Sequence, residues 1–78
     1  MKSKKFLITE LKKVFKKELN INVNDDSKIY DDEKWDSIGN FNLLLSIEKK
    51  SQINFNPQEF NKLNSFNEIL KIVAKKSK

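Results

Sequence analysis

The hydroxyl of Ser37 is the group in this sequence whose setting most favours chemistry. Ser37 follows Asp36, a residue type that often caps helices, and apolar residues at helical spacing begin directly after it. Unpaired backbone N–H groups and the positive end of the helix dipole meet in the first turn of a helix, so a phosphate esterified to this hydroxyl would be held favourably. Gly39, the only glycine, lies two residues further on, and its missing side chain is expected to leave room for an approaching group. An Asp-Ser pair is also common in ordinary capping, so the pair alone does not identify a site.

Side chains that the sequence lacks narrow the chemistry further. The 78 residues include no histidine and no cysteine. Nucleophilic catalysis by a Ser–His or Cys–His pair is therefore excluded, as are disulfides and the usual soft metal ligands. Asp31 and Asp32 are adjacent acids in a polar segment, where carboxylates more often cap and solvate than catalyse. The sequence therefore argues against an enzyme and predicts no metal site.

Two longer helices are expected on either side of a long loop. Apolar residues at spacings of three and four predict the first helix over residues 4–19, with Ser3 as its cap. The second helix is expected to begin at Asp36 or Ser37 and to end near Ser51. The apolar positions expected to face inward are Leu7, Ile8, Leu11, Val14, Phe15 and Leu19 in the first helix, and Ile38, Phe41, Leu44 or Leu45, and Ile47 in the second.

The end of the chain predicts a short helix and a further longer one. Asn56 and Pro57 precede Glu59 in the pattern of a capping box with proline at the first helical position. Ser65 and Glu68 have the spacing of a second capping box, after which the last helix runs toward a lysine-rich end expected to fray. The residues expected to face inward are Phe60, Leu63, Phe66, Ile69, Leu70 and Val73.

The segment over residues 20–35 shows no sustained period. Alternating asparagine and apolar residues at its start could suggest a strand, but a single strand has no partner elsewhere, so we predict a long ordered loop. The fold predicted for residues 1–78 is thus one all-α domain, a small four-helix bundle with three longer helices and one short helix. The residues expected to pin the loop to the core are Ile21, Val23, Ile29, Tyr30 and Trp35.

The residues around the serine resemble those of a known family. The run WDSIGNFNLL over residues 35–44 is similar to the signature of acyl carrier proteins, in which Asp-Ser-Leu starts the second helix. It is most similar to stand-alone carriers with Trp before the motif and an Asn-Leu pair after it. The likeness continues through residues 47–55, 57–63 and 65–73 and is weakest over residues 20–34. It therefore covers nearly the whole chain.

The resemblance implies a covalent cofactor and a set of partner enzymes. Ser37 would receive 4′-phosphopantetheine from coenzyme A through a separate phosphopantetheinyl transferase, and Asp36 would cap the helix beside the modified hydroxyl. The arm's thiol would hold an acyl or aminoacyl group, including D-alanine, for a loading enzyme and downstream transferases. The absence of cysteine fits, because the arm would supply the only thiol. The residues expected to face partners are Asp31, Asp32, Glu33, Ile38, Phe41 and Glu48.

The charge of the chain departs from the family's usual acidic character. The net charge is +5, but residues 20–48 carry −5, while residues 1–19 and 49–78 carry +5 each. Acids just before Ser37 keep its surroundings negative, and Glu48 is the main acid retained on the second helix. Electrostatic steering of a basic partner should therefore survive in reduced form. We expect a dedicated partner set in a specialised pathway rather than service to the general fatty-acid synthase.

The basic charge also suggests an alternative, a small helical domain that binds nucleic acid or another protein. Lys12, Lys13, Lys16 and Lys17 form either a solvated helix face or a contact for an acidic partner. The absence of arginine and the acidic centre argue against nucleic acid. The basic start precedes only three consecutive apolar residues, and no apolar run could span a membrane. We therefore expect a location in the cytoplasm. We also expect a monomer.

Overall fold

The computed structural model describes residues 4–76 and confirms the predicted small all-helical fold. The helices follow in chain order as α1 (Lys4–Leu19), α2 (Ser37–Ser51), α3 (Pro57–Lys62) and α4 (Phe66–Lys76). All four were expected at these places in the sequence. Ser3, predicted to cap α1, lies outside the described residues. Within residues 4–76, no helix has the length and apolar character needed to cross a membrane.

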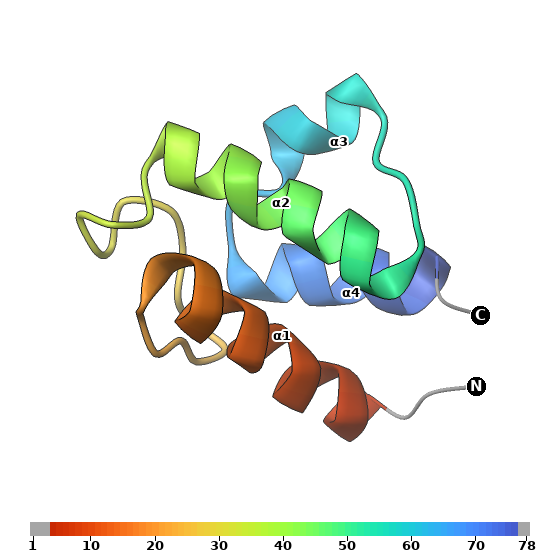
Figure 1. Ribbon diagram of the computed structural model, residues 1–78, viewed down its shortest axis with the longest axis horizontal. Helices are drawn as coiled ribbons and strands as arrows, with labels where there is room; N and C mark the ends of the chain where they lie inside the picture. The colour runs from red at the N-terminus through yellow and green to blue at the C-terminus, as the bar shows by residue number, and fades with distance from the viewer. Residues whose placement is uncertain (1–3, 77–78) are drawn as a thin grey trace.

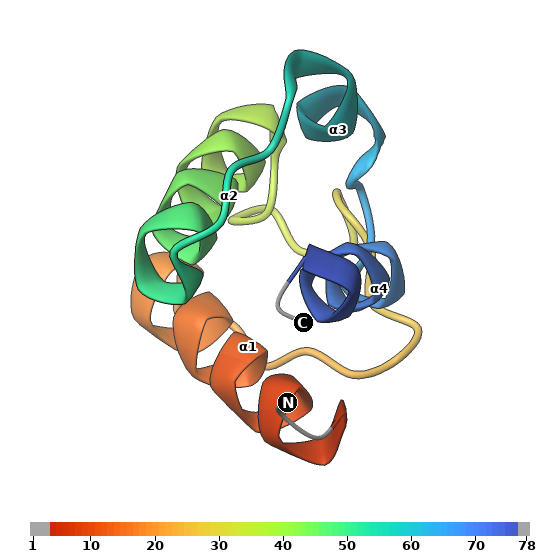
Figure 2. The same ribbon diagram turned by 90° about the vertical axis from the view of Figure 1, so that its right-hand side faces the viewer.

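The helices surround one core and leave the long loop at one end of the molecule. α1 and α2 lie side by side, α4 faces them across the core, and α3 lies near the side of α2 that is turned away from α1 (Figures 1 and 2). The loop over residues 20–36 and the start of α2 lie at one end in Figure 1. The start of α1 and the ends of α2 and α4 lie at the other end. The first residue of α2 is thus held next to the loop.

The core is built from apolar side chains of every longer helix and of the loops. The inward faces predicted for α1 and α4 are confirmed, except that Ile8 is only partly buried. Phe15 lies at the centre, with its ring 4.8 Å from that of Trp35 and 5.7 Å from that of Phe66. The buried apolar residues are Leu7, Leu11, Val14, Phe15, Leu19, Ile21, Val23, Trp35, Leu43, Leu44, Ile47, Ile53, Phe55, Leu63, Phe66, Ile69, Leu70 and Val73.

The inward face predicted for α2 was partly wrong. Ile38 is 74% exposed and Phe41 is 52% exposed, and Leu45 is exposed as well. These three residues form one stripe along the helix, at spacings of three and four. A second stripe is the one that turns to the core: Asn40, Leu43, Leu44 and Ile47. Because α2 is apolar on both stripes, its sequence alone could not show which one is buried.

The loop before α2 is ordered by backbone contacts with the segment before α4. Ile29 N–H donates to the Asn64 carbonyl at 2.7 Å, and Phe66 N–H donates to the Ser27 carbonyl at 2.9 Å. Lys28 and Ser65 form an isolated antiparallel bridge there. These bonds anchor both ends of the short connection to α4. Within residues 4–76 the segment contains no strand, as predicted.

One of the loop's expected anchors differs from prediction. Ile21, Val23 and Trp35 are buried as expected, and Ile29 is partly buried and packs against the core, but Tyr30 is 67% exposed. The backbone at Tyr30 has a φ of 73°, in the left-handed region. The prediction that Tyr30 pins the loop to the core was therefore wrong.

Helix ends follow the predicted capping chemistry with one difference. At α3, Glu59 N–H donates to the Asn56 side chain at 2.8 Å and Asn56 N–H donates to the Glu59 carboxylate at 2.9 Å, which completes the capping box. At α4, Glu68 N–H donates to the Ser65 hydroxyl at 3.2 Å. The Glu68 carboxylate accepts instead from that hydroxyl, at 3.1 Å. The second box is thus only half formed.

Candidate functional site

Ser37 is the first residue of α2 and is exposed. The preceding residue, Asp36, is the N-cap: its carboxylate accepts from Gly39 N–H at 2.8 Å, and its carbonyl accepts from Asn40 N–H at 2.7 Å. This confirms Asp36 as the helix cap. The N–H groups of Ser37 and Ile38 have no acceptor within the described part of the chain. Two backbone donors therefore remain for an anion at the positive end of the helix.

Gly39 does not leave room for an approaching group. A Cβ atom at this position would lie 2.6 Å from the Lys34 carbonyl oxygen and 3.1 Å from the Leu19 Cδ2. The chain itself fills the space, because the loop before α2 packs closely on the helix. The expectation that Gly39 leaves space for an approaching group was therefore wrong. The missing side chain instead allows the loop to pack on the helix.

A buried polar network fixes the start of α2, and sequence reasoning missed it. The indole Nε1 of Trp35 donates to the Asn40 side-chain oxygen at 2.9 Å. The Asn40 amide nitrogen donates to the Leu63 carbonyl at 3.0 Å. Asn40 is only 5% exposed, and no buried side-chain polar atom in residues 4–76 is without a partner. A buried indole N–H needs an acceptor, so the tryptophan itself was the signal that a polar residue would turn inward.

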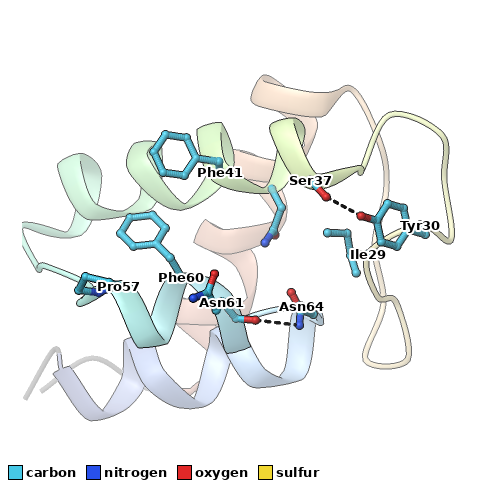
Figure 3. A pocket seen from close by; sticks show the side chains of 9 residues that line it. Ile29, Tyr30, Ser37, Phe41, Pro57, Phe60, Asn61 and Asn64 are labelled. Atoms are coloured by element: carbon cyan, nitrogen blue, oxygen red, sulfur yellow. Dashed lines mark hydrogen bonds between the residues drawn. The ribbon is translucent and has the colours of Figure 1, made fainter.

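Tyr30 meets Ser37 directly, which the sequence did not predict. The two hydroxyl groups share a hydrogen bond of 2.5 Å, and the phenol reaches Ser37 from the loop side (Figure 3). Tyr30 N–H donates to the Trp35 carbonyl at 2.7 Å, so the backbone of the tyrosine is tied to the segment before α2. Its φ of 73° lies in the left-handed region, where a residue other than glycine costs roughly 1–2 kcal/mol.

An open groove of about 670 Å³ begins at Ser37 and runs between α2 and α3. Phe41 of α2 and Phe60 of α3 pack against each other in its lining, with ring centroids 5.3 Å apart (Figure 3). Phe60 also packs edge-on against Phe55 at 5.9 Å, which holds the aromatic wall on the core. The groove thus combines an aromatic wall with several polar side chains. Its lining consists of Ile29, Tyr30, Ser37, Asn40, Phe41, Pro57, Phe60, Asn61 and Asn64.

The acidic residues predicted to face partners differ in how freely they can do so. Asp31 accepts from Lys28 N–H at 3.0 Å and Asp32 accepts from Lys34 N–H at 2.9 Å, so both shape the turns of the loop. Glu33 is exposed and has no hydrogen bond or ion pair within the described residues. Glu48 is half-buried, and its carboxylate accepts from Phe55 N–H at 2.6 Å.

Other carboxyl groups have lowered pKa values, but they belong to structural contacts. The Asn56 backbone N–H, together with the Lys76 ammonium 3.1 Å away, holds the pKa of the Glu59 carboxyl below its usual value of 4.5. The bond from Lys13, with a further ion pair to Lys50, does the same for Glu10. Within residues 4–76, no group of three or more acidic side chains is placed to hold a metal ion.

Charge is distributed unevenly between the two ends of the molecule. In the loop over residues 20–36, which lies beside Ser37, six acids outnumber two lysines. Two lysines also lie in the last turn of α1 at this end. The last turns of α2 and α4, which Figure 1 places at the opposite end, carry two lysines each. Five lysines of α1 are exposed along that helix: Lys5, Lys12, Lys13, Lys16 and Lys17. The surroundings of Ser37 are therefore negative although the chain as a whole is positive. The acids of the loop end are Asp25, Asp26, Asp31, Asp32, Glu33 and Asp36.

Comparisons with known proteins identify no relative of this chain. No family model, curated protein or solved structure matches it. A function must therefore be argued from the exposed serine, its helix, the tyrosine beside it and the groove.

Proposed function

We propose that this protein is a carrier, modified at Ser37 with 4′-phosphopantetheine and holding acyl or aminoacyl intermediates as thioesters. The observation that carries the proposal is the exposed Ser37 hydroxyl at the first residue of α2, beside an open groove. The resemblance of residues 35–44 to the acyl carrier signature supports it as well.

The chemistry at Ser37 requires an external catalyst. The chain contains no histidine or cysteine, and the Ser37 hydroxyl is paired with the Tyr30 hydroxyl rather than with a base. The Ser37 oxygen would attack the pantetheine-bearing phosphorus of coenzyme A. The P–O bond to the other phosphate then breaks, adenosine bisphosphate leaves, and the serine proton passes to a base on the transferase. In this proposal the protein is a substrate of the transferase and not an enzyme.

The residues at the start of α2 suit a phosphodiester anion. The free N–H groups of Ser37 and Ile38 point from the positive end of a helix of 15 residues. When bound, the arm supplies the thiol that carries the cargo. Its amides and its dimethyl group match a groove lined by Asn61 and Asn64 and by the rings of Phe41 and Phe60. The two free N–H groups and the mixed polar and aromatic lining therefore support the fit of the cofactor, while the acids of the loop oppose it in charge.

Partner enzymes are proposed to approach from the loop end. Glu33 offers a free carboxylate there, with Asp31 and Asp32 beside it. Ile38 and Phe41 add exposed apolar surface next to Ser37. Negative charge with an apolar centre suits a basic docking surface on a transferase or loading enzyme. We propose that the protein acts in this way as a monomer in the cytoplasm.

The decisive experiment offers the purified protein to a phosphopantetheinyl transferase with coenzyme A. Intact-mass analysis should show the gain of one phosphopantetheine group, and peptide mapping should place it on Ser37. Ser37→Ala should abolish the gain, while Ser46→Ala, a matched control on the same helix, should leave it unchanged. If the parent protein gains no mass while a known carrier is modified in the same tube, the proposal is wrong. If the parent protein is modified, intact-mass analysis of protein isolated from its native source would reveal the cargo.

A second candidate rests on the lysines of α1. Lys12, Lys16 and Lys17 are exposed and have no ion pair within the described residues, which leaves them available to an anionic partner such as nucleic acid. This function predicts DNA or RNA affinity that falls steeply with rising salt. The absence of binding at low salt would remove it.

A further inference from the structure

Tyr30 occupies a backbone position that favours glycine. Its φ is 73°; the other described non-glycine residues with a positive φ are Asn20 and Gln52, and each of these directly follows the end of a helix. The side chain receives little compensation from packing, because it is 67% exposed. Residues held in such conformations tend to cluster at functional sites. A bulky aromatic residue here needs a reason other than core stability.

The backbone on both sides of Tyr30 is firmly held. Ile29 N–H donates to the Asn64 carbonyl, Tyr30 N–H donates to the Trp35 carbonyl, and Asp31 N–H donates to the Lys28 carbonyl. Three successive N–H groups are thus bonded to three different parts of the chain. These bonds fix the backbone position from which the Tyr30 side chain extends. The phenol hydroxyl then hydrogen-bonds the Ser37 hydroxyl (Figure 3).

We infer that Tyr30 is a positioning residue for the modification at Ser37: its phenol orients the serine hydroxyl beforehand and hydrogen-bonds the phosphodiester afterwards. The inference rests on the proposed function and adds a residue to it. Tyr30 also lines the groove, so one side chain contacts both the attachment atom and the space offered to the arm.

The direction of the hydrogen bond follows from the chemistry of the ester. Before modification either hydroxyl can donate to the other. Once Ser37 is esterified its oxygen carries no proton, so only the phenol can donate. The charged phosphate oxygens are then the strongest acceptors within reach, and hydrogen bonds to charged acceptors are the stronger kind. Together with the free N–H groups of Ser37 and Ile38, Tyr30 would complete a set of three donors around the phosphate.

The test compares Tyr30→Phe, which removes only the hydroxyl, with the parent protein. We expect kcat/KM for phosphopantetheine transfer to fall roughly fivefold, as the loss of one hydrogen bond implies. The phosphorus NMR signal of the modified variant should differ from that of the modified parent. Thr9 is exposed on α1. Thr9→Val, which also removes one hydroxyl, should leave both readouts unchanged.

A second readout uses the fact that the chain has a single tyrosine. Carbon-13-labelled tyrosine gives ring signals from Tyr30 alone, and the hydroxyl-bearing carbon should shift when Ser37 is modified. Tyr30→Gly should lose transfer rate as Tyr30→Phe does, yet unfold at the same or a higher denaturant concentration, because glycine suits the backbone there.

Different failures would have different meanings. Identical phosphorus signals in parent and Tyr30→Phe, with an unmoved tyrosine carbon, would overturn the role of Tyr30 while leaving Ser37 modified and the carrier function intact. A Tyr30→Phe variant whose unfolding midpoint falls along with its transfer rate would also overturn it, because the bond would then serve the fold. A parent protein that gains no mass would overturn both proposals.

Discussion

The indole Nε1 of Trp35 lies 2.9 Å from the side-chain oxygen of Asn40, and both residues are buried. The pair joins the last buried residue of the loop to the second turn of α2. Asn40 also donates to the Leu63 carbonyl, so the same amide reaches the segment between α3 and α4. One side chain therefore ties together three segments that surround the Ser37 site.

Asn40→Ala should destabilise the protein by about 2–4 kcal/mol, because it leaves a buried indole N–H and a buried carbonyl without partners. Urea unfolding followed by circular dichroism measures the change. Asn42→Ala is the matched control, since Asn42 is exposed on the same helix, and it should change stability by no more than about 0.5 kcal/mol. Equal unfolding midpoints for the two variants would show that the network contributes nothing.

Gly39→Ala should also destabilise, although alanine is the better helix former by roughly 1 kcal/mol. The added Cβ would meet the Lys34 carbonyl oxygen at 2.6 Å, and a backbone atom cannot swing aside as a side chain can. Overpacking of this kind costs about 1–3 kcal/mol, so we expect a net loss of about 1 kcal/mol. Ser46→Ala, in the interior of the same helix, should be neutral or stabilising. A Gly39→Ala variant more stable than the parent would contradict the close packing.

Glu59 predicts a pH dependence of stability. Its pKa in the folded protein is lowered, chiefly by the Asn56 N–H and then by Lys76. A lowered folded-state pKa means that the group stabilises the fold above its usual value of 4.5 and loses this contribution as the pH falls through the folded-state pKa. Glu59→Gln should therefore lower the melting temperature at pH 7 and show a smaller further loss on acidification below pH 4.5. A Glu59→Gln variant with the parent's pH profile would refute the assignment.

Glu33 tests the proposed approach of partners. Its carboxylate is free, so Glu33→Lys changes charge without breaking a hydrogen bond within the described residues. With a transferase whose docking surface is basic, kcat/KM should fall roughly two- to fivefold at low salt. The difference should shrink as salt shortens the screening length. Lys75→Glu, a reversal at the opposite end, is the control, and an equal effect there would mean that only net charge matters.

The helices and their ends could be predicted from sequence because their signals are local. The spacing of apolar residues in α1 and α4, the Asn56–Glu59 capping box and the Asp36 cap each involve residues within one or two turns. The position of Ser37 at the first residue of α2 followed from the same local rules. These features do not depend on how the rest of the chain folds.

The features that were missed depend on contacts between distant segments. The choice between the two apolar stripes of α2 is made by Trp35 and Leu63, which turn Asn40 inward and leave Phe41 outside. The reason for Gly39 is the Lys34 carbonyl, which lies on it only after the loop has folded back. An aromatic residue such as Tyr30 is expected in the core by its type. In the structure it has a left-handed backbone conformation and its hydroxyl bonds to Ser37. Residue spacing carries none of this information, and residue type indicates only that the buried Trp35 indole needs an acceptor.

Acids outnumber lysines six to two in the loop beside Ser37, and lysines end α2 and α4 at the far end, so charge is graded along the molecule even though Lys16 and Lys17 at the end of α1 reduce the difference. Near a positively charged enzyme the protein would rotate before contact, so that the acidic end with Ser37 faces the enzyme. A protein with positive net charge can in this way turn its acidic end toward a cationic partner, because its orientation depends on how charge is distributed along the molecule and not on the net charge.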